Sequence, residues 1–413
     1  MKRRKISRAT RLLALALSAA VAGCSSGGNG GGGDNGPGGG LPPSNGPAAC
    51  TAGAAGNHSC SGISLRKRVS LAEMGGGSGN DLWGWVDPST GKEYALMGLS
   101  NGVSFVDISD PENPIVVGRL PTQTNASNWR DIKVYQDHAF IVADAAGSHG
   151  MQVFDLTRLE AAVPPATLAA DTVYTDFGSA HNIAINEDSG FAYVVGSDTC
   201  NEGLHMIDIS TPNNPMFAGC HSAFEVHDTV CVDYQGVDAA YIGREICFNS
   251  AKDRIEVVDV SDKTAPVTLG TTGYPQLAFV HQAWPTDDHR YLFVNDEIDE
   301  GSIGGRTRTF VIDMSDLDAP THAFTYQATT SSRDHNLYVL GNRMYQANYT
   351  TGLRVLEFMD PGAGEITEIA HFDTFPADDS IAFDGAWSVY PYLPSGNIIV
   401  SDSSNGLFIL TMP

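Results

Sequence analysis

The sequence predicts an all-β fold, a seven-bladed β-propeller of four-stranded blades that is closed by an N-terminal strand. Three observations lead to this prediction. A unit of about fifty residues recurs seven times, which is typical of repeat architectures. Each unit contains short apolar runs separated by turn residues. The last unit lacks its fourth strand, whereas an unpaired strand precedes the first unit.

The third repeat shows the strand pattern most clearly. A first strand starts at His181, and residues 187–190 form a turn before a second strand at 191–197. A third strand covers 204–210, a proline-containing turn follows at 211–215, and a fourth strand starts at residue 216. Alternating apolar residues bounded by Gly, Pro, Asn and Asp are the usual signature of such strands.

The third strand is the most regular part of the repeat. It recurs at 102–109, 151–156, 255–261, 309–315, 352–357 and 406–410. Several copies end in Asp-x-Ser, and we interpret this aspartate as a turn cap rather than a reactive group. Four-stranded units that close radially protect their strand edges, which favours a propeller.

The two ends of the repeat region are expected to meet. The seventh unit ends after its third strand, and the strand at 65–71 resembles the fourth strands of the other units. We therefore predict that residues 65–71 complete the seventh blade. The alternative is an open solenoid, which would need capping units, and none is visible in the sequence.

The repeats also resemble a known bacterial family. The third-strand runs resemble the LVIVD repeat, and the region 65–413 resembles the secreted family called choice-of-anchor B. The segments 179–186, 243–249, 334–339 and 385–392 carry this resemblance. It implies an exported propeller whose anchor differs from member to member, and it implies no particular reaction.

The N-terminus predicts export and lipidation. Six basic residues lie within the first eleven, an apolar stretch follows at 12–22, and the Val-Ala-Gly-Cys sequence that ends at Cys24 resembles a lipobox. We predict a lipoprotein signal peptide at 1–23 and acylation of Cys24; an ordinary signal peptide with an incidental cysteine is the alternative. Because Ser25 and Ser26 follow the cysteine, we expect a lipid-anchored protein of the bacterial cell envelope, at the outer membrane or cell surface.

A tether is expected between the anchor and the propeller. Residues 24–64 are rich in Gly, Ser and Pro, which favours disorder, and contain one small loop between Cys50 and Cys60. The predicted domains are thus a signal peptide at 1–23, a tether at 24–64 and a propeller at 65–413.

Composition limits the partners. The 413 residues carry a formal net charge of −24, which argues against nucleic acid, because phosphate binding needs clustered Lys and Arg. This charge favours a soluble surface that attracts cations. We expect a monomer whose partners are the membrane, through the lipid, and a protein or small polar ligand.

The remaining six cysteines predict disulfides. An even number of cysteines in an exported chain favours three bonds, and neighbours in the repeat suggest the pairs Cys50–Cys60, Cys200–Cys220 and Cys231–Cys247. A Cys/His zinc site is the rival, but the sequence has no C-x-x-C spacing.

One polar position recurs at the start of the innermost strands. If the units are blades, these residues form a ring at one mouth of the central channel; by alignment they are Asp81, Arg130, His181, His227, His281, His335 and Gly385. The next residues are also polar, namely Asp131, Asn182, Asp228, Gln282 and Asn336. Second-strand ends add Ser100, Asp144, Asp198, Glu245, Asp296, Glu297 and Asp402.

Three interpretations of this ring stay open. The side chains can be structural and hydrogen-bond neighbouring loops. They can instead bind a ligand at the mouth, for which the candidates are Asp81, Arg130, Asp131, His181, His227, Asp228, His281 and His335. They can also hold a divalent metal as cofactor, for which the candidates are His181, His227, His281, His335, Asp296 and Glu297.

The predicted function is therefore a binding or interaction module with an unknown ligand. The alternative is a metal-assisted hydrolase or lyase in which His281 and Asp296 or Glu297 form an acid–base pair. We assign no catalytic residue, because no catalytic motif occurs in the context it needs. The acidic loop 295–301 is a separate candidate for calcium.

Overall fold

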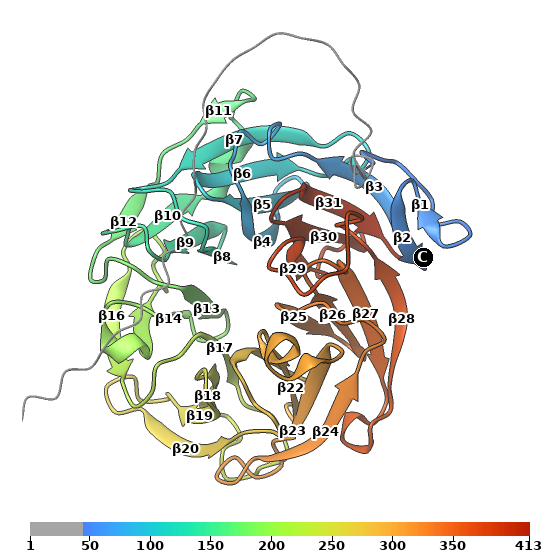
Figure 1. Ribbon diagram of the computed structural model, residues 1–413. Helices are drawn as coiled ribbons and strands as arrows, with labels where there is room; N and C mark the ends of the chain where they lie inside the picture. The colour runs from blue at the N-terminus through green and yellow to red at the C-terminus, as the bar shows by residue number, and fades with distance from the viewer. Residues whose placement is uncertain (1–43) are drawn as a thin grey trace, which may run out of the picture. The chain divides into compact units, whose positions relative to one another are not determined.

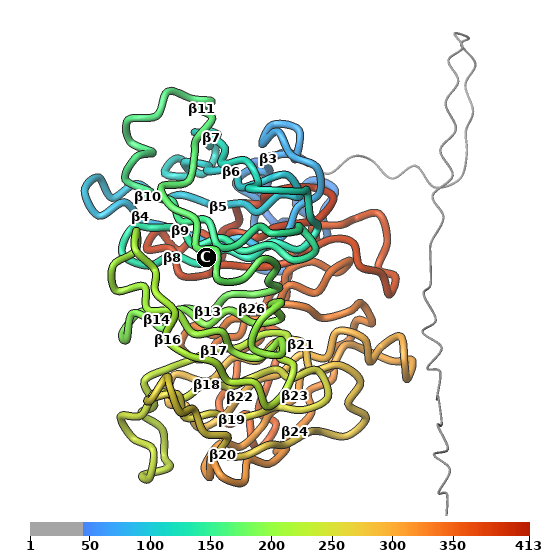
Figure 2. The backbone as a smooth tube through the Cα atoms, turned by 90° about the vertical axis from the view of Figure 1, so that its left-hand side faces the viewer, coloured from blue at the N-terminus to red at the C-terminus, as the bar shows by residue number. Residues whose placement is uncertain are grey.

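The computed structural model describes residues 44–413 and confirms the seven-bladed propeller. Seven sheets are arranged radially around one axis (Figure 1), and each contains a blade of four antiparallel strands; short additional strands extend two of the sheets. The strands run between the two faces of the ring, and the connecting loops project from both faces (Figure 2). The predicted signal peptide, Cys24 and the tether up to residue 43 lie outside the described residues.

The blades follow one another in chain order. Blades one to three contain β4 (Gly79–Val86), β5 (Glu93–Leu99), β6 (Gly102–Asp107) and β7 (Ile115–Pro121); β8 (Arg130–Tyr135), β9 (His138–Ala143), β10 (Met151–Asp155) and β12 (Thr172–Tyr174); and β13 (Asn182–Asn186), β14 (Phe191–Val195), β15 (Leu204–Asp208) and β16 (Met216–His221). Blades four and five contain β17 (Asp228–Asp233), β18 (Glu245–Ser250), β19 (Ile255–Asp259) and β20 (Val267–Thr272); and β21 (Val280–Pro285), β22 (Tyr291–Asp296), β23 (Arg308–Asp313) and β24 (Thr321–Gln327). Blades six and seven contain β25 (Leu337–Leu340), β26 (Arg343–Ala347), β27 (Leu353–Phe358) and β28 (Ile366–Phe372); and β29 (Ala386–Tyr390), β30 (Asn397–Asp402), β31 (Gly406–Thr411) and β3 (Ser64–Val69).

Few other elements occur in the described part of the chain. The short strand β11 (Ala166–Thr167) pairs in parallel with β7, and four helical turns are η1 (Leu156–Leu159), η2 (Cys200–Glu202), η3 (Glu300–Gly304) and η4 (Pro361–Ala363). Within residues 44–413, no helix has the length and apolar character that crossing a membrane requires.

The hydrophobic core lies between neighbouring blades. Seven clusters of buried apolar residues occur, one at each interface between consecutive blades, including the interface of blade seven with blade one. Phe105 of blade one, for example, stacks on Phe154 of blade two with ring centroids 5.0 Å apart. Each blade therefore buries its two faces only when both neighbours are present.

The Asp-x-Ser turn after the third strands is a structural cap, as predicted. In blade three, Asp208 accepts hydrogen bonds from the backbone N–H and the hydroxyl of Ser210, at 2.9 and 2.6 Å. Asp107 makes the same two bonds with Ser109. One oxygen of each carboxylate is engaged in the turn, which agrees with the local capping role of Asp.

A β-bulge recurs between the third and fourth strands. The pairing shifts register at this place in blades one and three to six, and between β3 and β31 in blade seven. A bulge adds local twist. Its repetition is consistent with the strongly twisted blades that a closed ring requires.

The predicted closure of the ring is confirmed. Strand β3 pairs in antiparallel fashion with β31 and forms the outer strand of blade seven, so both ends of the propeller share one sheet (Figure 1). Leu65 and Val69 of β3 are buried against this blade. Closure joins strands that are more than three hundred residues apart in the chain.

The folded part of the chain starts earlier than the predicted boundary at residue 65. A hairpin of β1 (Ala54–Ala55) and β2 (His58–Ser61) extends blade six, because β2 pairs with β28. His58 is buried, donates from Nδ1 to the backbone oxygen of Asp373 at 2.7 Å and stacks on Phe372. The predicted tether at 24–64 is therefore too long, since its last part is an ordered strap on the propeller.

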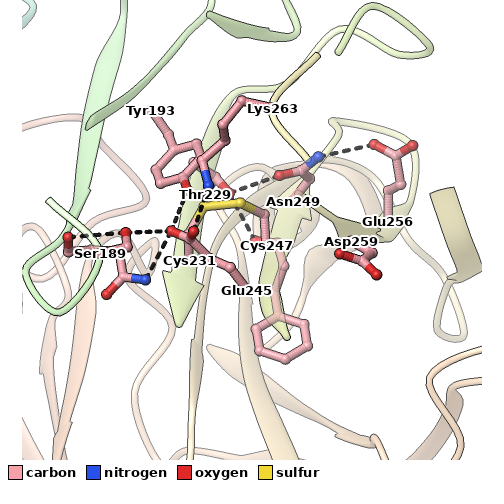
Figure 3. The surroundings of a disulfide bond; sticks show 12 residues. Ser189, Tyr193, Thr229, Cys231, Glu245, Cys247, Asn249, Glu256, Asp259 and Lys263 are labelled. Carbon is pink, nitrogen blue, oxygen red and sulfur yellow. Dashed lines mark hydrogen bonds and ion pairs between the residues drawn. A yellow bond between two sulfur atoms is a disulfide. The ribbon is translucent and has the colours of Figure 1, made fainter. Parts of the chain in front are cut away.

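All three predicted disulfides are present, as Cys50–Cys60, Cys200–Cys220 and Cys231–Cys247. The Cys231–Cys247 bond joins directly opposite residues of β17 and β18 (Figure 3). Beside it lies Glu245, which the sequence analysis assigned to a second-strand end. The structure corrects this, because Glu245 starts β18, where it accepts from Ser189 at 2.6 Å and pairs with Lys263 at 2.5 Å.

Candidate ligand site at the channel mouth

Four histidines from four consecutive blades lie side by side. His181 directly precedes β13, and His227 directly precedes β17. His335 lies just before β25, and His281 lies in β21 at a bulge. Neighbouring ring centroids are 4.4 Å apart for His181 and His227, 4.4 Å for His227 and His281, and 4.2 Å for His281 and His335. The predicted convergence of these histidines is therefore found, and we call them the histidine arc.

The histidine arc lines a cavity of about 520 Å³. Aromatic side chains form much of the remaining wall, namely Trp129 just before blade two, Tyr349 of blade six, Phe383 just before blade seven and Trp387 in β29 of blade seven. The carboxyl groups in the lining belong to Glu297 and Asp384. The cavity is large enough for an ion or a small molecule rather than for a folded partner.

Backbone carbonyl groups fix the tautomer of two of these histidines, His227 and His335. The Nδ1 atom of His227 donates to the carbonyl oxygen of His281 at 3.0 Å, and Nδ1 of His335 donates to the carbonyl oxygen of Trp387 at 2.5 Å. A carbonyl oxygen only accepts, so Nδ1 carries the proton. In a neutral ring the Nε2 atom then has a free lone pair, which makes it an acceptor or a metal ligand.

Burial keeps three of these histidines neutral. Burial, together with the neighbouring imidazoles, lowers the pKa of His227 well below its ordinary value. Burial likewise lowers the pKa of His281 and of His335 to about 3. Because a charged imidazolium loses hydration in this site and meets other imidazoles, the neutral form predominates at neutral pH.

Glu297 brings a carboxyl group to the end of the histidine arc. Its Oε2 lies 3.9 Å from Nε2 of His281, and its Oε1 lies 3.8 Å from Nε2 of His335. The hydroxyl of Tyr349 donates to Oε1 at 2.6 Å, and Arg333 donates to the Glu297 backbone oxygen at 2.6 Å. Between residues 44 and 413, His281, Glu297 and His335 form the one group of three or more candidate ligands whose donor atoms lie within 4.8 Å of one another.

The first histidine of the arc has a different partner. His181 donates from Nδ1 to Oδ2 of Asp144 at 3.0 Å, and its side chain is more exposed than those of His281 and His335. The hydrogen bond from His181 is the main reason why the pKa of Asp144 falls to about 2. Asp144 therefore orients His181 rather than taking up a ligand itself.

Arg130 is not part of the cavity, although it occupies the aligned position. Its guanidinium turns between blades one and two, where Nε donates to the Leu99 carbonyl at 3.1 Å, Nη1 contacts His149 at 3.0 Å and Nη2 donates to Thr122 at 2.8 Å. The reason is physical: a buried guanidinium needs several acceptors, and the blade interface supplies them. Trp129, one residue earlier, lines the mouth instead.

Asp81 and Asp131 also lie outside the mouth cavity, deeper in the channel. Both carboxylates pair with Lys133, whose Nζ is 3.3 Å from Asp81 and 2.5 Å from Asp131. Asp131 additionally accepts the backbone N–H of Ile183 from the next blade, at 2.7 Å. In blade one, a bulge between Gly79 and Leu82 shifts the pairing of β4 with β5. As a result, Gly79 lines the mouth cavity at the place where the sequence alignment predicted Asp81.

Asp228 lies toward the opposite end of the channel. It lines a second cavity of about 480 Å³ together with Lys133, Trp83 and Trp284. Burial raises the pKa of Asp228 to about 7. Asp228 directly follows His227, a residue of the predicted ring, and is thus directed away from the mouth. Gln282 directly follows His281 and accepts from the backbone N–H of Leu337 in the next blade.

Asp296 is not available as a metal ligand. Its two oxygens accept the backbone N–H groups of Ala278 and Phe279, at 2.7 and 2.8 Å, and the hydroxyl of Tyr274 at 3.0 Å. Its role is to hold the segment before β21. Of the two acidic residues predicted beside His281, the geometry selects Glu297.

The comparisons with known proteins support the repeat and the fold. A family model described as the LVIVD repeat matches residues 92–122 and 177–221, in blades one and three. No curated protein matches the chain. These comparisons therefore establish the presence of LVIVD repeats in the chain.

Solved structures with the same architecture have low sequence identity. The chain is similar to a putative 6-phosphogluconolactonase from Bacteroides fragilis (14% identity, 69% of this chain and 82% of that chain, TM-score 0.50). It is also similar to a Kuenenia stuttgartiensis hydrazine synthase (11%, 78% and 93%, TM-score 0.53) and to the β-propeller domain of Swd1 from Myceliophteria thermophila (9%, 85% and 99%, TM-score 0.53). Likeness at this level concerns the fold alone.

Proposed function

We propose that this protein is a binding module of the bacterial cell envelope that takes a small cationic ligand at the histidine arc. The observation that carries the proposal is the chemistry of the arc, where neutral imidazoles present Nε2 lone pairs next to the Glu297 carboxyl group. Acceptors on one side of a small cavity suit a ligand that is positively charged or rich in donors.

The surroundings of the cavity support the same ligand class. The chain has a formal net charge of −24, which raises the local concentration of cations near its surface. Asp384 adds a second carboxyl group to the lining, and the aromatic rings of Trp129 and Trp387 can contact an organic cation. Arg130, the one basic residue expected at the mouth, is directed elsewhere.

The cellular part of the proposal rests on the sequence. The lipobox-like segment that ends at Cys24 and the resemblance to choice-of-anchor B proteins support export and lipid anchoring. We expect the protein in the membrane fraction and labelled by a radioactive or alkyne fatty acid. The Cys24→Ala variant is expected to lose the label; a label that persists in this variant contradicts acylation at Cys24.

Calorimetric titration tests the binding proposal. The purified protein is titrated with spermidine, choline, Mn²⁺ and Zn²⁺, and then the His227→Ala and Glu297→Gln variants are compared. Binding of at least one cation should weaken ten-fold or more in both variants. His138→Ala and Glu365→Gln are matched controls outside the cavity lining and should bind like the wild type. If none of the four cations binds, or if these variants bind normally, the proposal is wrong.

A metal-assisted hydrolase or lyase is the second candidate. It is favoured by the 3.9 Å approach of His281 Nε2 to Glu297, a pair that could exchange protons with a substrate. Turnover of ester, lactone or uronide substrates that is lost in His281→Ala but retained in His138→Ala would support this candidate. If the protein binds a cation but turns over none of these substrates, the enzyme candidate is wrong and the binding-module proposal stands.

A further inference from the structure

We propose that the cation at the histidine arc is a divalent transition metal ion, held by Nε2 of His281, Nε2 of His335 and the carboxylate of Glu297. This inference rests on the proposed function, since it names the ligand of the same site. We refer to these three residues as the metal triad. They come from β21, from the segment before β25 and from the residue after β22, so two adjacent blades build the site.

The spacing within the metal triad fits an ion better than direct contacts. The separations of 3.8 and 3.9 Å between the Glu297 oxygens and the imidazole nitrogens are too long for hydrogen bonds. A tetrahedral ion with bonds of about 2.0–2.1 Å separates neighbouring ligand atoms by about 3.4 Å. Movements of about half an ångström would bring each Glu297 oxygen to this distance from its imidazole nitrogen. The three donor groups lie within 4.8 Å of one another, so small side-chain rotations would gather them around one ion.

Two of the three residues of the metal triad, His335 and Glu297, already have the hydrogen-bond partners of a second coordination shell, whereas Nδ1 of His281 is buried without a partner among the described residues. The Nδ1 atom of His335 is held by the Trp387 carbonyl at 2.5 Å, which directs Nε2 away from that backbone. The hydroxyl of Tyr349 holds Oε1 of Glu297 at 2.6 Å. Metal-binding imidazoles usually donate their other N–H to a carbonyl or carboxylate, and ligating carboxylates are themselves hydrogen-bonded.

Burial makes the metal triad an unfavourable arrangement without a cation. The side chains of His281 and His335 are 3% and 5% exposed, and that of Glu297 is 15% exposed. The Oε2 atom of Glu297 has no contact shorter than its 3.9 Å approach to His281 among the interactions of the described residues. A poorly solvated carboxylate of this kind is stabilised by a positive ion.

The donor set selects the class of metal. Two imidazole nitrogens and one carboxylate, without thiolate, suit Zn²⁺, Mn²⁺, Fe²⁺ or Ni²⁺ and disfavour Ca²⁺ and Mg²⁺, which prefer oxygen. His227 lies next to His281, with ring centroids 4.4 Å apart, and can supply a third nitrogen as the fourth ligand. His181 is one blade further along the arc, next to His227, and we do not assign it to the ion.

Metal content and cobalt titration test the inference. Full-length protein that has never met a chelator is dialysed, and its metal is measured by mass spectrometry; about one equivalent of a transition metal is expected. After metal removal, Co²⁺ should give a visible absorption band that saturates at one equivalent. His281→Ala and Glu297→Gln should weaken Co²⁺ binding at least ten-fold, and Tyr349→Phe should weaken it about ten-fold through the lost hydrogen bond.

Controls separate this inference from the broader proposal. His138→Ala and Glu365→Gln should keep the wild-type Co²⁺ band, and circular dichroism should show that all variants are folded. If His281→Ala unfolds the protein, Glu297→Gln carries the test alone. If spermidine or choline binds in a manner that depends on His227 and no metal binds, the metal inference is wrong and the binding-module proposal stands. Metal that binds equally in wild type and triad variants overturns the inference, and absence of all cation binding overturns both proposals.

Discussion

The ion-pair cluster deep in the channel leads to a sharp prediction about stability. Lys133 lies between Asp81 and Asp131, and the side chains of all three are at most 12% exposed. The Lys133 Nζ atom also lies 4.7 Å from the centre of the Trp83 ring. We predict that Lys133→Met, which keeps the aliphatic stem and removes the charge, strongly destabilises the propeller.

The magnitude follows from the two carboxylates that remain. Burial already raises the pKa of Asp81 well above its ordinary value, and Lys133 acts against this effect. Without the ammonium group, two buried carboxylates face each other, and removing one partner of a buried ion pair costs about 3–5 kcal/mol. The folded-state pKa of Asp81 then rises further, and that of Asp131, which Lys133 now lowers, rises above the unfolded value of 3.8. The loss should therefore be small near pH 4 and grow as the pH rises.

Urea denaturation at pH 4.5 and pH 7.5, followed by tryptophan fluorescence, measures this loss. Lys92→Met is the control, because Lys92 makes an exposed pair with Asp107 at 3.2 Å and should cost less than about 1 kcal/mol. The double variant Lys133→Met with Asp81→Asn should recover about 1–2 kcal/mol, since one uncompensated charge is gone. A Lys133→Met variant that matches Lys92→Met at both pH values would refute the reasoning.

Three further predictions concern other parts of the fold. Burial raises the pKa of Glu300 to about 9, so the wild type loses stability as the pH rises from 4.5 to 9. The Glu300→Gln variant should therefore have a higher urea midpoint than the wild type at pH 8.5 and the same midpoint at pH 4.5. Replacing Cys231 and Cys247 by serine opens a loop with a separation of 16 residues and should cost about 3 kcal/mol in urea denaturation; a loss below 1 kcal/mol contradicts the loop-entropy argument. Replacing Cys50 and Cys60 by serine should speed trypsin cleavage near residue 66 without changing the far-ultraviolet circular dichroism; equal cleavage rates would show that the strap holds without its disulfide.

The repeat made most of the fold predictable. Third strands recur in all seven blades and end in Asp-x-Ser in four of them. The unpaired strand at 65–71 identified the closure, because backbone pairing and burial follow the period of the pattern. The hairpin β1–β2 was missed, since a Gly-rich and Ser-rich segment carries little apolar signal. Its order comes from Cys60, His58 and the edge of blade six, which are tertiary effects.

The candidate site was predictable only in part. The four histidines recur at one offset, so the sequence indicated that they meet. The direction of Arg130 was not predictable, because it depends on acceptors from three separate segments. The aromatic residues Trp129 and Trp387 line the mouth one and two positions from the aligned residues Arg130 and Gly385. At Trp387 a bulge shifts the register. The sequence named both Asp296 and Glu297 as candidate metal ligands. Only the structure shows that the oxygens of Asp296 are already occupied by hydrogen bonds, which leaves Glu297.

The N-terminal strap has a mechanical consequence. Tension applied to the chain before Ser44 meets the propeller first at Asn45 and Ala48, which are bonded to Arg68 and Leu65 of the closing strand. The covalent bond between Cys50 and Cys60 takes the intervening residues out of the load path, so a pull cannot lengthen that loop. Force therefore reaches the seam of the ring at β3, the strand whose pairing with β31 closes blade seven.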